Sequence, residues 1–190
     1  MHAAIITHIQ KFISLSAEDI AIIEAATEIT TIKKKEFLFN AGQLCHANYF
    51  VVRGCLRLYI DNDKGAEQMI QFGIDNWWIT DYMSLNSGRP SEFCLQAIED
   101  SEVIILDTKT RDKLLLQIPA LERYFRILTE MAYGAAQMRV HYIFSMSGRE
   151  RYKHFNERFP QFVQRVPQYL LASYLGISPE FLSRLRAEKE

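Results

Sequence analysis

The stretch from Gln168 to Ala187, QYLLASYLGISPEFLSRLRA, has the spacing of a helix-turn-helix. Two helices that cross steeply over a turn of three or four residues come very close, so a small side chain is needed near the crossing. Ala172 meets this need, and Gly176 suits a turn that requires a positive φ angle. Other apolar residues are expected to hold the two helices together: Leu171, Leu175, Ile177, Leu182 and Leu185.

The second helix of this motif has a clear start, with Ser178 as its N-cap and Pro179 at its first position. A recognition helix in the major groove would turn Pro179, Glu180, Ser183 and Arg184 toward the bases. We expect Arg184 to donate two hydrogen bonds to a guanine and Glu180 to accept one from N4 of a cytosine. Phosphate contacts are expected from Ser178, Arg186 and Lys189.

Plainer explanations exist for the same residues. An unrelated pair of antiparallel helices meets several of the spacing conditions, and Glu180 also stabilises the helix dipole. The basic side chains also suit a solvated surface.

Residues 149–190 carry 8 Lys/Arg and 5 Asp/Glu, whereas residues 1–148 carry 14 Lys/Arg and 18 Asp/Glu. The basic charge therefore gathers at the end of the chain that holds the motif.

A long helix is predicted upstream, from Pro119 to about residue 146, where Ser147-Gly148 ends it. This end marks the predicted boundary between a domain over 1–146 and one over 147–190. Apolar residues in the helix recur three, four or seven apart, which favours a dimerisation helix. Packing on the barrel of the same chain is the alternative. The apolar stripe consists of Leu121, Phe125, Leu128, Ala132, Ala135 and Tyr142.

Short β-prone runs separated by turn residues occupy the chain between Thr31 and Asp107. Several short strands at close spacing predict a sandwich or barrel. Helical patterns flank this region, over 5–29 and 108–117. The predicted fold class is therefore α+β: an N-terminal β-barrel or jelly roll with flanking helices, a long helix and a small helical C-terminal domain. The predicted strands are 37–39, 49–52, 56–60, 69–72, 93–98 and 103–106.

Composition narrows the functional classes. Hydrophobic residues make up 48% and charged residues 24%, and the longest apolar runs are far shorter than a membrane span. We expect a cytoplasmic protein with no membrane partner. The three cysteines lack CxxC spacing and the five histidines lack HxH or HExxH spacing, so buried thiols and no metal site are expected. No catalytic constellation is present, so we expect no enzyme.

The barrel, the long helix and the terminal helix-turn-helix together resemble the Crp/Fnr family of bacterial regulators over nearly the whole chain. Residues 37–42, FLFNAG, resemble the family's early strand and turn, residues 49–54, YFVVRG, resemble its hydrophobic strand, and Gly65 matches a further glycine. The resemblance implies a cyclic-nucleotide-binding-type barrel, a homodimer and binding to double-stranded DNA, with RNA polymerase as a further candidate partner. In the second helix of the motif, the positions that match the catabolite-activator branch are Ser178, Glu180 and Arg184.

Three departures from the family pattern affect function. The family's phosphate-binding cassette has an arginine where this chain has Ser91, and Glu92 follows it. A cyclic phosphate would meet no charge-assisted clamp there, so we expect no binding of cyclic AMP in the usual manner. Pro179 replaces an arginine of the catabolite-activator branch, so base preference should differ. The segment 160–166 is too short for the usual wing hairpin.

The effector, whose chemical identity the sequence leaves open, is expected around residues 70–93. Trp77-Trp78 indicates an aromatic pocket there, or alternatively two rings that cover the barrel and touch the helical linker. We predict a homodimeric DNA-binding transcription regulator with an effector-sensing barrel. The alternative is a ligand-binding or protein-interaction module that has lost specific DNA binding. The candidate pocket residues are Gln71, Trp77, Trp78, Asp81, Tyr82, Arg89, Ser91 and Glu92.

Overall fold

The computed structural model describes residues 2–62 and 65–188, and the chain forms two compact units. The first unit comprises residues 1–60 and 70–129, and the second comprises 61–69 and 130–190. The predicted domain boundary between residues 146 and 147 falls inside the second unit. The boundary between residues 146 and 147 therefore stays a prediction.

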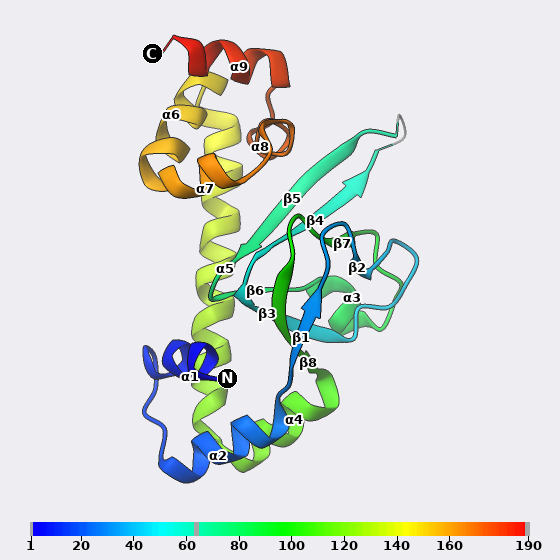
Figure 1. The fold of residues 1–190 in the computed structure, drawn as a ribbon, viewed down its shortest axis with the longest axis vertical. Helices are drawn as coiled ribbons and strands as arrows, with labels where there is room; N and C mark the ends of the chain where they lie inside the picture. The colour runs from blue at the N-terminus through cyan, green and yellow to red at the C-terminus, as the bar shows by residue number, and fades with distance from the viewer. Residues whose placement is uncertain (1, 63–64, 189–190) are drawn as a thin grey trace. The chain divides into compact units, whose positions relative to one another are not determined.

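Two four-stranded sheets form the barrel (Figure 1). The first sheet has the order β1-β8-β3-β6 and the second has the order β2-β7-β4-β5. Each strand of the first sheet runs antiparallel to its neighbours. The strands of the first sheet are β1 (Ile29–Ile32), β8 (Ser101–Asp107), β3 (Ala47–Arg53) and β6 (Trp77–Ile79). Those of the second are β2 (Phe37–Phe39), β7 (Cys94–Ala97), β4 (Cys55–Asp61) and β5 (Glu67–Ile74).

Alternation along β3 divides the apolar side chains between two cores, because successive residues of a strand point to opposite faces. Tyr49 and Val51 lie in the cluster inside the barrel, together with Leu56 and Leu95 of the second sheet. Phe50 belongs to the other cluster, which joins the outer face of the first sheet to helices. The barrel interior is therefore filled largely by its own side chains.

Helices cover the outer face of the first sheet (Figure 1). They are α1 (Ala3–Gln10), α2 (Ala17–Ala26), α4 (Thr108–Gln117) and the beginning of α5 (Ala120–Ser145). Ser16 caps α2 in a reciprocal capping box with Asp19. Trp78 Nε1 donates to the Tyr124 hydroxyl at 2.8 Å, and this hydroxyl lies 2.7 Å from His8 Nδ1. Tyr124 thus ties α1 and β6 to α5.

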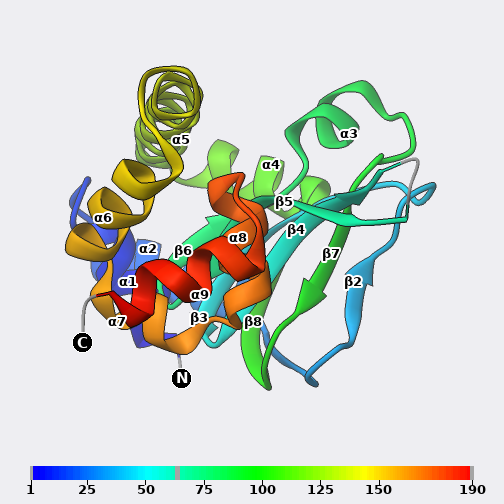
Figure 2. The same ribbon diagram turned by 90° about the horizontal axis from the view of Figure 1, so that it is seen from above.

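The second unit contains the rest of α5 and four shorter helices. These are α6 (Gly148–Arg158), α7 (Pro160–Arg165), α8 (Gln168–Leu175) and α9 (Pro179–Ala187). Helices α8 and α9 lie next to each other in both views (Figures 1 and 2). The segment Asp61–Met69 also belongs to this unit: the Ser173 hydroxyl donates to the Glu67 carbonyl and accepts from the Met69 amide, both at 3.0 Å.

The predicted fold class is confirmed, with the barrel, the long helix and the C-terminal helices in the expected order. The helical stretch predicted over 5–29 is instead two helices that end before β1, because Ile29 already pairs with Ile104. The short elements β6 and α3 (Tyr82–Ser87) were not predicted. Among the described residues, no helix combines the length and the apolar character needed to cross a membrane.

Candidate functional site

The turn between α8 and α9 has the geometry that the sequence predicted. Gly176 adopts a φ of 66°, in the left-handed region that favours glycine. The amide of Ile177 donates to the Ala172 carbonyl at 3.0 Å and closes the end of α8. Ala172 is fully buried at the crossing, as the close approach of two helices requires. The leucines predicted to join the helices are also buried: Leu171, Leu175, Leu182 and Leu185.

Helix α9 begins as expected, with the Ser178 side chain accepting a hydrogen bond from the Phe181 amide at 3.1 Å and Pro179 in the first turn. The backbone amide of Glu180 and then the Ser178 hydroxyl hold the pKa of the Glu180 carboxyl below its usual value. Glu180 is therefore anionic at neutral pH and stabilises the start of the helix.

The side of α9 that faces away from α8 is open to solvent. Ser178, Pro179, Glu180, Ser183 and Arg184 are all exposed. The Arg184 guanidinium lies 5.5 Å from the centre of the Phe181 ring, which supports the arginine from one side. Of the three predicted phosphate contacts, Arg186 is half-buried and Lys189 lies outside the described residues.

Two contacts from α6, which the sequence analysis did not single out, hold α9 in place. Arg149 forms an ion pair with Glu188 just beyond the end of α9. Gly148 lies so close to the turn that an added Cβ would be 2.6 Å from Ile177 Cγ2 and 3.1 Å from Phe181 Cε1. Helix α6 therefore approaches Ile177 and α9 at a distance that only glycine permits.

The predicted dimer stripe on α5 is divided between different environments. Leu121 is buried in the core of the first unit, and Phe125 and Leu128 pack against the same core. Ala132 and Ala135 are exposed, and Tyr142 is half-buried, with its ring 4.7 Å from that of His154. Several large apolar side chains of the later turns are exposed instead: Met131, Tyr133, Met138, Val140, Ile143 and Phe144.

At the place of the phosphate-binding cassette, the chain makes a closed set of internal hydrogen bonds. The Ser91 hydroxyl donates to Asp81 at 2.6 Å, and both residues are 3% exposed. The other carboxylate oxygen of Asp81 accepts from the amides of Met83 and Ser84 and caps α3. The Ser84 hydroxyl donates to the Arg89 carbonyl at 2.6 Å. The Asp81 carboxyl group thus accepts from three donors of this chain and occupies the buried part of this segment.

The eight candidate effector residues lie in different environments. Asp81 and Ser91 are buried and bonded to each other, whereas Tyr82, Arg89 and Glu92 are exposed. Trp77 is 42% exposed and Gln71 is half-buried. Trp78 lies against Phe50 and Phe125 on the outer face of the first sheet, with ring centres 5.2 and 5.7 Å apart, and contacts the helical linker. This arrangement matches the alternative in which the ring covers the barrel.

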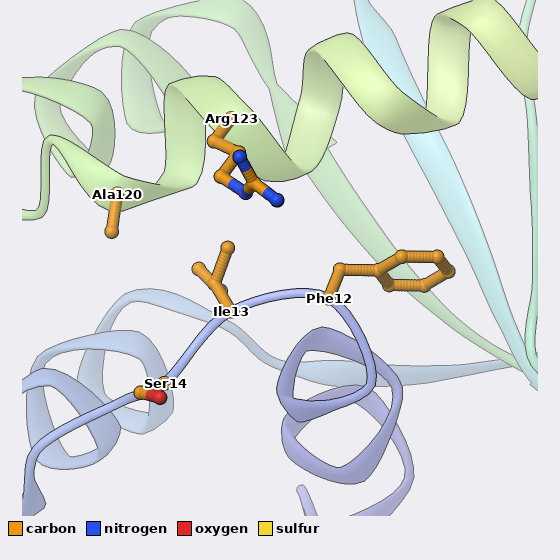
Figure 3. A pocket seen from close by; sticks show the side chains of 5 residues that line it. All are labelled: Phe12, Ile13, Ser14, Ala120 and Arg123. Carbon is orange, nitrogen blue, oxygen red and sulfur yellow. The ribbon is translucent and has the colours of Figure 1, made fainter.

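A surface hollow of about 460 Å³ lies elsewhere, between the end of α1 and the start of α5 (Figure 3). It is lined by Phe12, Ile13, Ser14, Ala120 and Arg123, none of which was a candidate. Among the described residues, no group of three His, Cys, Asp or Glu side chains is placed to hold a metal ion.

Comparison with known proteins agrees with this architecture. Residues 29–117 match the family model of the cyclic nucleotide-binding domain. The transcriptional activator protein Anr of Pseudomonas protegens is 27% identical over an alignment that covers 91% of this chain and 75% of Anr. FixK2 from Bradyrhizobium japonicum superposes with a TM-score of 0.71 at 19% identity, covering 85% of this chain and 83% of FixK2. The Catabolite Activator Protein of Thermus thermophilus gives 0.58 at 19% identity, covering 92% and 84%.

Over residues 29–117 the chain matches the cyclic nucleotide-binding domain, and over most of its length it is similar to Anr and has the fold of FixK2 and the Catabolite Activator Protein. The family-model match begins with β1 and ends with α4, so it covers the barrel. The helix-turn-helix lies outside that match. Its assignment is supported by the geometry of α8 and α9 and by the similarity to Anr, which extends over most of the chain. The departure at Ser91 is notable because the barrel has the family fold while the cassette carries a different set of polar groups.

Proposed function

We propose that this chain is a homodimeric transcription regulator of the Crp/Fnr family that reads double-stranded DNA with α9. The observation that carries the proposal is a capped helix, packed on α8 through Leu182 and Leu185, that exposes Glu180, Ser183 and Arg184 together. A helix with this support and this outward face suits the major groove. The similarity to Anr, a transcriptional activator, supports the same function.

The proposed dimer face is the later part of α5. Met131, Ala135, Met138 and Tyr142 are spaced by four, three and four residues, which is the period of a coiled-coil seam. Met131 and Met138 are 58% and 45% exposed within the chain. A second copy of α5 would remove this apolar surface from water. Leu121 has no part in this face, because it is already buried in the first unit.

We propose that the barrel senses an effector other than a cyclic nucleotide held in the usual cassette. Support comes from Asp81, whose carboxylate accepts from Ser91 and from two backbone amides. A cyclic phosphate at that place would face a buried carboxylate in place of the arginine. Under this proposal the protein acts in the cytoplasm, and RNA polymerase is its partner at promoters.

Selection of random duplex DNA on the purified full-length protein tests the proposal. We expect an enriched palindrome, and binding that weakens steeply as salt rises, because phosphate contacts release counterions. A palindrome indicates that two copies bind with two-fold symmetry. Enrichment of no sequence would favour the alternative function, a barrel module that acts through ligands or proteins without specific DNA binding.

A further inference from the structure

A single guanidinium, that of Arg151 on α6, joins the ends of two helices of the second unit. Nε donates to the Leu175 carbonyl at 2.8 Å and Nη2 to the Gly176 carbonyl at 3.3 Å. Nη1 donates to the Met146 carbonyl at 2.6 Å and lies 3.4 Å from the Ile143 carbonyl. The first pair ends α8 and the second pair ends α5.

The terminal carbonyls of a helix lack partners within the helix and carry partial negative charge. One cation therefore caps both C-termini at once. Only arginine can do so, because its planar fork directs donors to several acceptors, whereas the lysine ammonium is a single point charge. The hydrogen bonds of Arg151 thus link the end of α5 to the turn of the helix-turn-helix.

The connection that this link spans is short. Only Met146 and Ser147 separate α5 from α6, and Ser147 is held by a capping box with Glu150. Gly148 approaches Ile177 closely on the same side of the turn. The direction of α9 relative to α5 therefore depends in part on Arg151, which makes four polar contacts across this connection.

We propose that Arg151 is a positioning residue that fixes the orientation of the helix-turn-helix on α5 and so sets the half-site spacing that the dimer reads. The inference rests on the proposed DNA-binding dimer. In a dimer joined through α5, the angle between α5 and α9 determines how far apart the two recognition helices lie. Two-fold readers bind half-sites separated by about one helical turn, so a small change in this angle changes the preferred spacing.

The DNA test compares the wild type with Arg151→Gln, Arg151→Lys and a control, Arg158→Gln, which removes an exposed guanidinium from the same helix. The probes are the selected palindrome and versions with one or two base pairs inserted or deleted at its centre. For Arg151→Gln we expect the affinity ratio between the best and the altered spacings to fall by about tenfold, while the penalty for a mismatched base persists. Arg151→Lys should resemble Arg151→Gln. A spacing ratio within twofold of the wild type, or equal loss of spacing and base preference, would overturn the proposal.

A second measurement does not depend on DNA. Spin labels at Gln137→Cys on α5 and Ser183→Cys on α9, in protein diluted with unlabelled chains, report the intrachain distance; the native cysteines are buried. We expect a narrow distance distribution that Arg151→Gln broadens and Arg158→Gln leaves unchanged. Equal widths would refute the positioning role even if a palindrome is found. Broadening without any selected sequence would support it and instead reject the proposed DNA function.

Discussion

Replacement of Gly148 by alanine tests how α6 holds α9. The added Cβ would lie 2.6 Å from Ile177 Cγ2 and 3.1 Å from Phe181 Cε1, both closer than ordinary contacts. Overpacking of this kind costs about 1–3 kcal/mol. Alanine regains up to about 1 kcal/mol of helix propensity over glycine. The steric cost outweighs this gain, so we expect a net loss of about 1–2 kcal/mol.

Hydrogen exchange measured by mass spectrometry can locate this loss. Peptides from 168–187 should exchange about 5- to 30-fold faster in Gly148→Ala, the factor that corresponds to 1–2 kcal/mol. Peptides from β3 and β4 should be unchanged. The matched control is Gly134→Ala on α5, where the added Cβ meets nothing within 4 Å and should stabilise the helix. Unchanged exchange over 168–187 in Gly148→Ala would refute the argument from close approach.

Three further predictions concern the dimer, the cassette and α1. Met131→Glu should shift the sedimenting species toward the 22.2 kDa monomer, whereas Leu116→Glu, on α4 and more exposed than Met131, should not; a dimer that survives Met131→Glu places the interface elsewhere. Calorimetry with micromolar cyclic AMP should show no binding heat, and a clear isotherm would reverse the interpretation of Ser91. Burial, with a smaller contribution from Lys11, lowers the pKa of His8 below 6.5 in the folded state. The unfolded chain then binds this proton more tightly, so stability should fall as the pH drops below 6.5. Chemical denaturation should show a weaker fall for His8→Phe, and equal slopes would contradict the prediction.

The helix-turn-helix could be predicted from the sequence because its determinants are local. A left-handed glycine, a serine N-cap and leucines at fixed spacing specify the two helices and the turn without reference to the rest of the chain. The observed φ of Gly176 and the burial of Ala172 follow directly from these residues. The α+β fold class was predictable for the same reason, since short β runs and long helical periods differ in pattern.

The proposed dimer face of α5 could not be predicted from its periodicity. The stripe that begins at Leu121 and Phe125 is apolar because it packs on the first sheet, and a coiled-coil seam has the same period. Arg151 was missed because its partners are backbone carbonyls of residues up to 25 positions away, which leave no pattern in the sequence. The Asp81–Ser91 bond likewise depends on the fold, which brings together the residues that flank α3.

The most direct test of the central claim is a base-by-base binding profile of Arg184→Ala on the selected palindrome. Each position of the half-site is changed to all four base pairs, and affinities are compared with those of the wild type at fixed salt. If α9 reads the major groove, Arg184→Ala should lose about 1–3 kcal/mol of discrimination at one base pair and keep its preferences elsewhere. A uniform loss at all positions would assign Arg184 to a phosphate, and an unchanged profile would show that α9 is not the recognition helix.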